Sequence, residues 1–201
     1  MIVQNIILNN PHTQVWGLFV YININTIMLR KLLDTMFNLF KRKTADTEFE
    51  FDMPTTSQNG QYDCRYEVFR SLDKYYNGST DSVLILRNKF PDAEKSDSAM
   101  AKMYSSKNLA LNDITETVSS FSTEVEKAGF LISLMKENKA VIAEFMIKSN
   151  GRTYGHAVGV KVVKTFSNGK VVIKVMNPSG EGGGRFTSFK DFTRFISVTK
   201  F

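Results

Sequence analysis

The single cysteine of the chain, Cys64, lies where the polar stretch QNGQYD (58–63) gives way to a helical pattern. A thiol is nucleophilic as the thiolate, and the N-terminus of a helix favours a negative charge. This placement predicts that the pKa of Cys64 is lowered and that the sulfur is reactive. The alternative is that Cys64 is a small apolar side chain buried in the core.

A histidine and an asparagine occur at matching ends of two predicted strands. His156 opens the β-branched run HAVGVKVVKTF (156–166), and Asn177 follows the run KVVIKVM (170–176), with the turn SNGK between the two runs. Adjacent antiparallel strands bring the start of one beside the end of the other, so Asn177 can accept the ring N–H of His156. Thiol, imidazole and orienting amide together have the composition of a nucleophile triad.

The elements that must position these residues change type along the chain. Amphipathic helical patterns occupy the first part, with Gly78 as a stop for the helix that begins at Cys64 and a capping box from Ser122 or Thr123 to Glu126. These helices are expected in the ranges 64–78, 98–106, 111–121 and 122–138. Strands are expected in the ranges 140–148, 156–166 and 170–176. Helices followed by an antiparallel sheet predict an α+β fold.

The order of these motifs resembles the papain-like cysteine peptidase superfamily, closest to the bacterial branch related to double-glycine leader peptidases. Gln58, Asp63 and Cys64 stand at that branch's spacing, and they are followed by GHAVGV around His156 and by NPSGEGG from Asn177. The resemblance covers roughly residues 55 to 201. Two positions depart from the branch, which usually has Gly where Arg65 stands and Asp where Asn177 stands.

The resemblance implies a papain-like fold, with the nucleophile on a helix start packed on a C-terminal antiparallel sheet. It implies Cys64 as nucleophile, His156 as general base and acid, Asn177 as the residue that orients the imidazole, and Gln58 as an oxyanion-hole donor, with no metal or cofactor. The leading interpretation is a stand-alone cysteine peptidase acting on a peptide or protein. The alternatives are a deamidase or acyltransferase that uses the same thiol, or an inactive domain that binds a protein or nucleic-acid partner.

The first 50 residues are expected to be separate from the catalytic domain (51–201). Residues 1–29 carry no charged side chain, but they lack the basic start of a signal peptide and enough uninterrupted apolar length to span a membrane. Residues 28–43 predict a basic amphipathic helix, which can contact a membrane surface, dock on its own domain or belong to a pro-region. A polar linker is expected to follow, to about Gly60.

The charge of the chain and its few cysteines and histidines limit the kinds of partner and metal site that we expect. The net charge is +6, and residues 152–201 alone hold nine Lys and Arg against two acidic residues. This excess fits solvated strand faces better than a nucleic-acid surface, because no known nucleic-acid motif accompanies it. One cysteine excludes an internal disulfide, and two histidines are too few for a zinc site without carboxylates. A cytoplasmic location is favoured, and the oligomeric state is left open.

Overall fold

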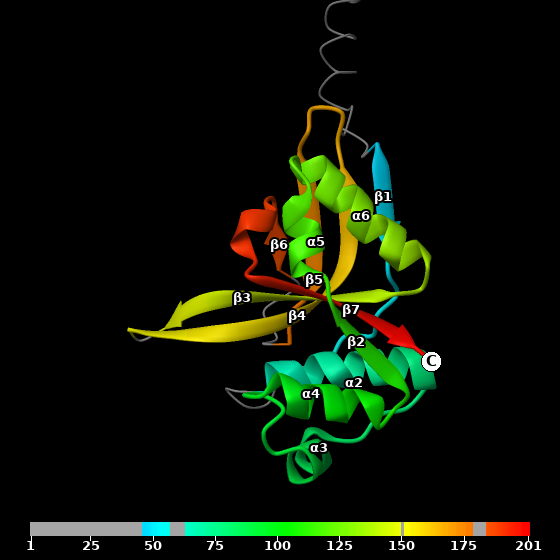
Figure 1. Cartoon of the computed structure of the whole chain (residues 1–201), viewed down its shortest axis with the longest axis vertical. Helices are drawn as coiled ribbons and strands as arrows, with labels where there is room; N and C mark the ends of the chain where they lie inside the picture. The colour runs from blue at the N-terminus through cyan, green and yellow to red at the C-terminus, as the bar shows by residue number, and fades with distance from the viewer. Residues whose placement is uncertain (1–45, 57–62, 150, 179–183) are drawn as a thin grey trace, which may run out of the picture. The chain divides into compact units, whose positions relative to one another are not determined.

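The structure, a computed structural model, describes residues 46–56, 63–149, 151–178 and 184–201. The predicted helix at 28–43 and Gln58 lie outside the described residues. The chain divides into two units at Thr44/Ala45, and the second of them is an α+β fold built on an antiparallel sheet (Figure 1). The expected order of helices first and most strands second is therefore present.

The sheet has seven strands in the described part of the chain, in the order β2-β7-β3-β4-β5-β6, with β1 paired to β4. Every pairing is antiparallel. The strands are β1 (Thr47–Glu50), β2 (Leu109–Asp113), β3 (Ala140–Ser149), β4 (Arg152–Thr165), β5 (Val171–Met176), β6 (Arg185–Phe186) and β7 (Arg194–Lys200). β3 and β4 extend beyond the rest of the sheet as a two-stranded hairpin (Figure 1).

Helices pack against this sheet in two groups (Figure 1). In the described residues they are α2 (Cys64–Asn77), α3 (Val83–Lys89), α4 (Asp97–Ser105), α5 (Thr115–Ser120) and α6 (Glu124–Lys136), with a 3₁₀ turn at Phe189–Asp191. The first group, α2 to α4, contacts β4 and β2, and the second group, α5 and α6, contacts β7, β3, β4 and β1. The thiol and the histidine therefore come from two different layers, a helix and the sheet.

Local sequence explains the helix that carries the thiol. Val68, Phe69 and Leu72 recur at helical spacing, and all three are fully buried. The helix stops at Gly78, which adopts a left-handed φ of 78° and donates its N–H to the carbonyl of Lys74. The predicted start, stop and buried stripe of α2 are confirmed.

The predicted helix at 122–138 is also confirmed and is α6. Thr123 caps α6 and forms the predicted capping box, in which its hydroxyl accepts the N–H of Glu126 while that carboxylate accepts the N–H of Thr123. The helix buries Ala128, Leu131 and Met135. Because α6 contacts β3 and β4, this face covers the strand pair that carries His156.

The expected linker is corrected by the structure. Residues 47–50 form β1 and pair with β4, and the side chains of Phe51 and Met53 are 2% and 0% exposed. A boundary at residue 50 would therefore cut a strand away from its sheet. The signal was present as the alternation of apolar Phe49, Phe51 and Met53 with polar residues, which is typical of a half-buried strand.

Further elements differ from the expectation. The predicted helix at 111–121 is a strand, β2, followed by the shorter helix α5, and α3, β6 and β7 were not predicted. β2 and β7 pair with each other at the edge of the sheet, so each depends on a partner far away in the sequence. In the part of the chain described, no helix is long and apolar enough to cross a membrane.

Candidate active site

Cys64 is the first residue of α2, as predicted, and its side chain is buried at 7% exposure. The buried carboxylate of Asp63, directly before it, is paired with the guanidinium of Arg87 on α3. Two residues after Cys64, the hydroxyl of Tyr66 on α2 donates to the carbonyl of Phe90 at 2.6 Å. These contacts fix the helix start against α3 and the loop that follows it.

His156 lies within β4 rather than at its start, because the strand begins at Arg152. Its imidazole is 7% exposed and packs edge-on against Phe145, with ring centroids 5.3 Å apart. Phe145 is opposite His156 in the strand register and contacts Phe186 and Phe192 in turn. An aromatic cluster thus restricts the tilt of the imidazole.

Asn177 follows β5 directly and reaches the imidazole. Its Oδ1 lies 2.8 Å from Nε2 of His156, so the predicted contact between the two side chains is present. When Nε2 carries the proton it donates to this amide oxygen, and Nδ1 is left as an acceptor. The pair therefore has the geometry of an imidazole held in one tautomer by an amide.

One cavity of about 480 Å³ brings the thiol and the imidazole together. From the helical side it is lined by Cys64, Arg65, Glu94 and Lys95. From the β3–β4 hairpin it is lined by Glu144, Ile147, Thr153, Tyr154, Gly155, His156 and Ala157. The thiol and the imidazole therefore border the same cavity.

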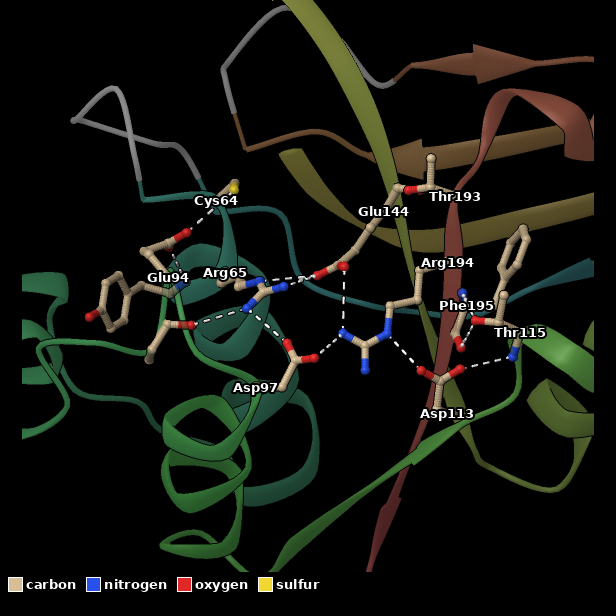
Figure 2. A network of polar contacts seen from close by, with 12 residues as sticks. Cys64, Arg65, Glu94, Asp97, Asp113, Thr115, Glu144, Thr193, Arg194 and Phe195 are labelled. Carbon is tan, nitrogen blue, oxygen red and sulfur yellow. Dashed lines mark hydrogen bonds and ion pairs between the residues drawn. The ribbon is translucent and has the colours of Figure 1, made fainter. Parts of the chain in front are cut away.

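The polar partner of the thiol is Glu94, a residue of the α3–α4 loop that the sequence did not single out. The Sγ–H of Cys64 donates to Oε2 of Glu94 over 3.6 Å (Figure 2). The N–H of Tyr66 donates to Oε1 of Glu94 over 3.1 Å. The carboxyl group therefore occupies the start of α2, where helix N–H groups attract anions.

This environment raises the pKa of Cys64 to about 12, which corrects the predicted lowering. Burial is the main cause, and the charge of Glu94 adds to it. The backbone N–H groups of Ala157 and Arg65 act in the opposite direction by hydrogen bonding to the sulfur. The thiol shown is therefore protonated at neutral pH, because desolvation outweighs the helix start.

Burial also acts on Glu94, whose pKa is raised to about 7. Hydrogen bonds from Tyr66 and Cys64 and the charge of Arg65 offset part of that effect. The carboxyl group consequently changes its charge near neutral pH, directly beside the only thiol.

Arg65, the departure from the leader-peptidase pattern, joins the helix start to the sheet. Its guanidinium contacts the carboxylates of Glu144 on β3 and Asp97 at the start of α4 (Figure 2). Arg194 on β7 contacts Asp97 and Asp113 at 2.8 and 2.7 Å. A network of ion pairs thus connects α2, α4, β2, β3 and β7 next to the thiol.

Sequence reasoning identified Cys64, His156 and Asn177, and the structure brings all three to one region. Gln58 lies outside the described residues. Arg185, one of the basic residues of the segment 152–201, lines a second pocket with residues of β1, β4 and β5, and this pocket does not include the thiol. Glu94 and Glu144 were missed; nothing local marks an acidic residue of a loop or strand as a neighbour of a thiol.

Comparison of the chain with protein-family models and with curated proteins found no match. Within the described ranges, no group of three or more His, Cys, Asp and Glu side chains is arranged to hold a metal ion.

Proposed function

We propose that the protein is a papain-like cysteine peptidase that cleaves a peptide or protein with Cys64, His156 and Asn177. The observation that carries the proposal is the 2.8 Å contact between Nε2 of His156 and Oδ1 of Asn177, in an imidazole that shares a cavity with the thiol. This contact reserves Nδ1 for proton exchange with Sγ. Cys–His–Asn sets work by this division of roles.

In the proposed reaction, Nδ1 of His156 takes the proton of Cys64 as Sγ attacks the carbonyl carbon of the scissile bond. The C=O electron pair moves to the oxygen, and the backbone N–H of Cys64 with the side chain of Gln58 stabilises that oxyanion. Collapse of the intermediate breaks the C–N bond, and the imidazolium gives its proton to the leaving amine. Water, deprotonated by His156, then hydrolyses the thioester and restores the thiol.

The proposal requires the thiol to exchange partners. In the structure the Sγ–H points to Glu94, and the pKa of Cys64 is about 12. We infer that rotation of the side chain about its first torsion lets Sγ–H leave Glu94 and face the imidazole, because both side chains line the same cavity. Protonation of Glu94 weakens the contact that holds the thiol away, because a neutral carboxyl group accepts a hydrogen bond less strongly than a carboxylate.

The contact between Cys64 and Glu94 favours a second candidate function. A buried, protonated thiol paired with a carboxyl group suits an inactive papain-like domain that binds a protein partner. Deamidation and acyl transfer remain chemically open to the active form, because all three reactions begin with a thioester on Cys64.

The test is incubation of the full chain with a mixed peptide library, followed by mass analysis of the products. Wild type is compared with Cys64→Ala, His156→Ala and Asn177→Ala, and His12→Ala serves as the matched histidine control. Cleavage that is lost with Cys64→Ala and His156→Ala, reduced with Asn177→Ala and retained with His12→Ala supports the peptidase. Mass shifts without cleavage indicate deamidation or acyl transfer, and an unchanged library across all proteins favours the binding domain.

A further inference from the structure

The residue that follows the nucleophile is tied to the sheet by a two-point ion pair. Nε of Arg65 donates to Oε1 of Glu144 over 3.0 Å, and Nη2 lies 2.9 Å from the same oxygen. The two side chains are only 15% and 14% exposed. A partly buried, charge-assisted contact of this kind is stronger and better defined than an exposed ion pair.

Glu144 stands at one particular place in the sheet. It is opposite Ala157 in the β3–β4 register, next to the Phe145–His156 pair. Cys64, Arg65, Glu144, His156 and Ala157 all line the same cavity. The ion pair therefore ties the residue after the nucleophile to the strand pair that carries His156.

The β3 end of this ion pair is held by Thr193 and by Arg194 on β7. The N–H and hydroxyl of Thr193 both donate to the carbonyl of Glu144, over 2.8 and 3.1 Å. Arg194 places its guanidinium 3.8 Å from the second carboxylate oxygen of Glu144 and bonds Asp97, which also contacts Arg65 (Figure 2). The carboxylate of Glu144 is thus a fixed anchor for Arg65.

We propose that Arg65 and Glu144 are positioning residues, which hold the start of α2, and with it Cys64, against the strand pair that carries His156. The inference rests on the proposed function for its catalytic meaning. The helix start and β4 belong to different layers, and rates in such sites fall steeply when reacting groups shift by about an ångström. The ion pair joins these layers at the residue adjacent to the nucleophile.

The experiment measures two properties of the only thiol in the full-length chain. One is the pKa of Cys64, from the ultraviolet absorbance of the thiolate, and the other is the rate of alkylation by iodoacetamide across pH. The variants are Arg65→Met, Glu144→Met and the double variant, with Arg65→Lys as a milder change. Arg70→Met is the matched control, because it removes an arginine of the same helix whose ion pair, with Glu67, lies outside the cavity. Thermal unfolding of each variant establishes that it folds.

We expect Arg65→Met and Glu144→Met to move the pH profile of Cys64 alkylation in the same direction, because either change frees the start of α2 from β3. Loss of the two opposite charges alone would move it in opposite directions. Each variant should slow the His156-dependent alkylation by roughly tenfold, with the double variant no slower than either one, since the two residues act as a unit. Arg65→Lys should fall between wild type and Arg65→Met, and Arg70→Met should leave the pH profile unchanged.

An unchanged pKa and pH profile in folded Arg65→Lys and Arg65→Met overturns the inference, as do opposite shifts in Arg65→Met and Glu144→Met, an additive loss in the double variant or an equal shift in Arg70→Met. Failure of the proposed function has a different signature. In that case wild type and His156→Ala are alkylated at the same rate, while the effect of Arg65→Met and Glu144→Met on the thiol pKa still decides whether the ion pair positions the sulfur.

Discussion

At the scale of single residues, the site is governed by the charge of one carboxyl group. Glu94 contacts the sulfur, and its own pKa is raised to about 7 by burial. Above that pH the carboxylate repels a thiolate at Cys64, and below it the group is neutral and can only share a hydrogen bond. The reactivity of Cys64 should therefore respond to the protonation of its neighbour as well as to its own.

Replacing Glu94 by Gln should speed alkylation of Cys64, and only in part of the pH range. Glutamine is neutral throughout, so the gain should appear above about pH 7, where wild type carries the charge, and vanish below it. We expect a gain of roughly threefold to tenfold, because one pKa unit corresponds to a tenfold change in thiolate population.

The measurement is the iodoacetamide rate for both proteins across pH. Glu116→Gln, the same change at an exposed position of α5, is the control and should leave the rate unchanged. A gain of equal size at all pH values would show that the charge of Glu94 is not the cause.

At the scale of elements, the helices and strands with strong local signals are the ones that position the site. α2 has a glycine stop, Gly78, and α6 has a capping box at Thr123 and Glu126. β3, β4 and β5 are β-branched runs joined by turn residues. Each of these elements therefore stabilises the site partly through residues that lie outside it.

The capping box of α6 gives a prediction at this scale. Thr123→Ala removes the hydroxyl that accepts the N–H of Glu126, and we expect a loss of about 1 kcal/mol in the free energy of unfolding. The check is denaturant unfolding, with Ser122→Ala as the control, since Ser122 contacts Glu126 through its backbone N–H. A loss of similar size in both variants would assign the effect to general fraying of the helix start.

What the sequence could predict follows the same division between local and distant contacts. The helix start at Cys64, the strand that carries His156 and the strand end before Asn177 were accessible, because each is marked by neighbours in the chain, although β4 begins earlier, at Arg152. β2 and β7 were not, because they pair across more than 80 residues. The raised pKa of Cys64 was missed for the same reason: burial and Glu94 are tertiary effects, whereas the helix start is local.

At the scale of the whole molecule, the folded unit begins before the boundary that the sequence suggested. β1 pairs with residues 162–165 of β4, and Phe51 donates its N–H to the carbonyl of Lys161 at 2.7 Å. The strand that carries His156 is thus covered at its far end by residues 47–51. Removal of these residues should weaken the sheet on which the imidazole depends.

A chain that begins at Ala45 should therefore unfold cooperatively and keep the cavity thiol, and one that begins at Asp52 should be less stable by about 3–5 kcal/mol. The loss corresponds to deleting one large buried aromatic side chain together with its strand. Denaturant unfolding of the two chains is the measurement, with Phe51→Ala in the longer chain to separate the side chain from the strand. Equal free energies of unfolding for the two chains would show that β1 does not stabilise the sheet, as expected of a linker.

The most direct test of the central claim, that Cys64 and His156 work as one thiol–imidazole pair, is the ratio of alkylation rates between wild type and His156→Ala. It is best measured at about pH 6, below the raised pKa of Glu94, where the competing carboxyl group is neutral. A working thiol–imidazole pair predicts that wild type reacts faster by on the order of a hundredfold, the usual size of general-base assistance. Equal rates in two folded proteins would contradict it, and Cys64 would then be a buried thiol beside an unrelated histidine.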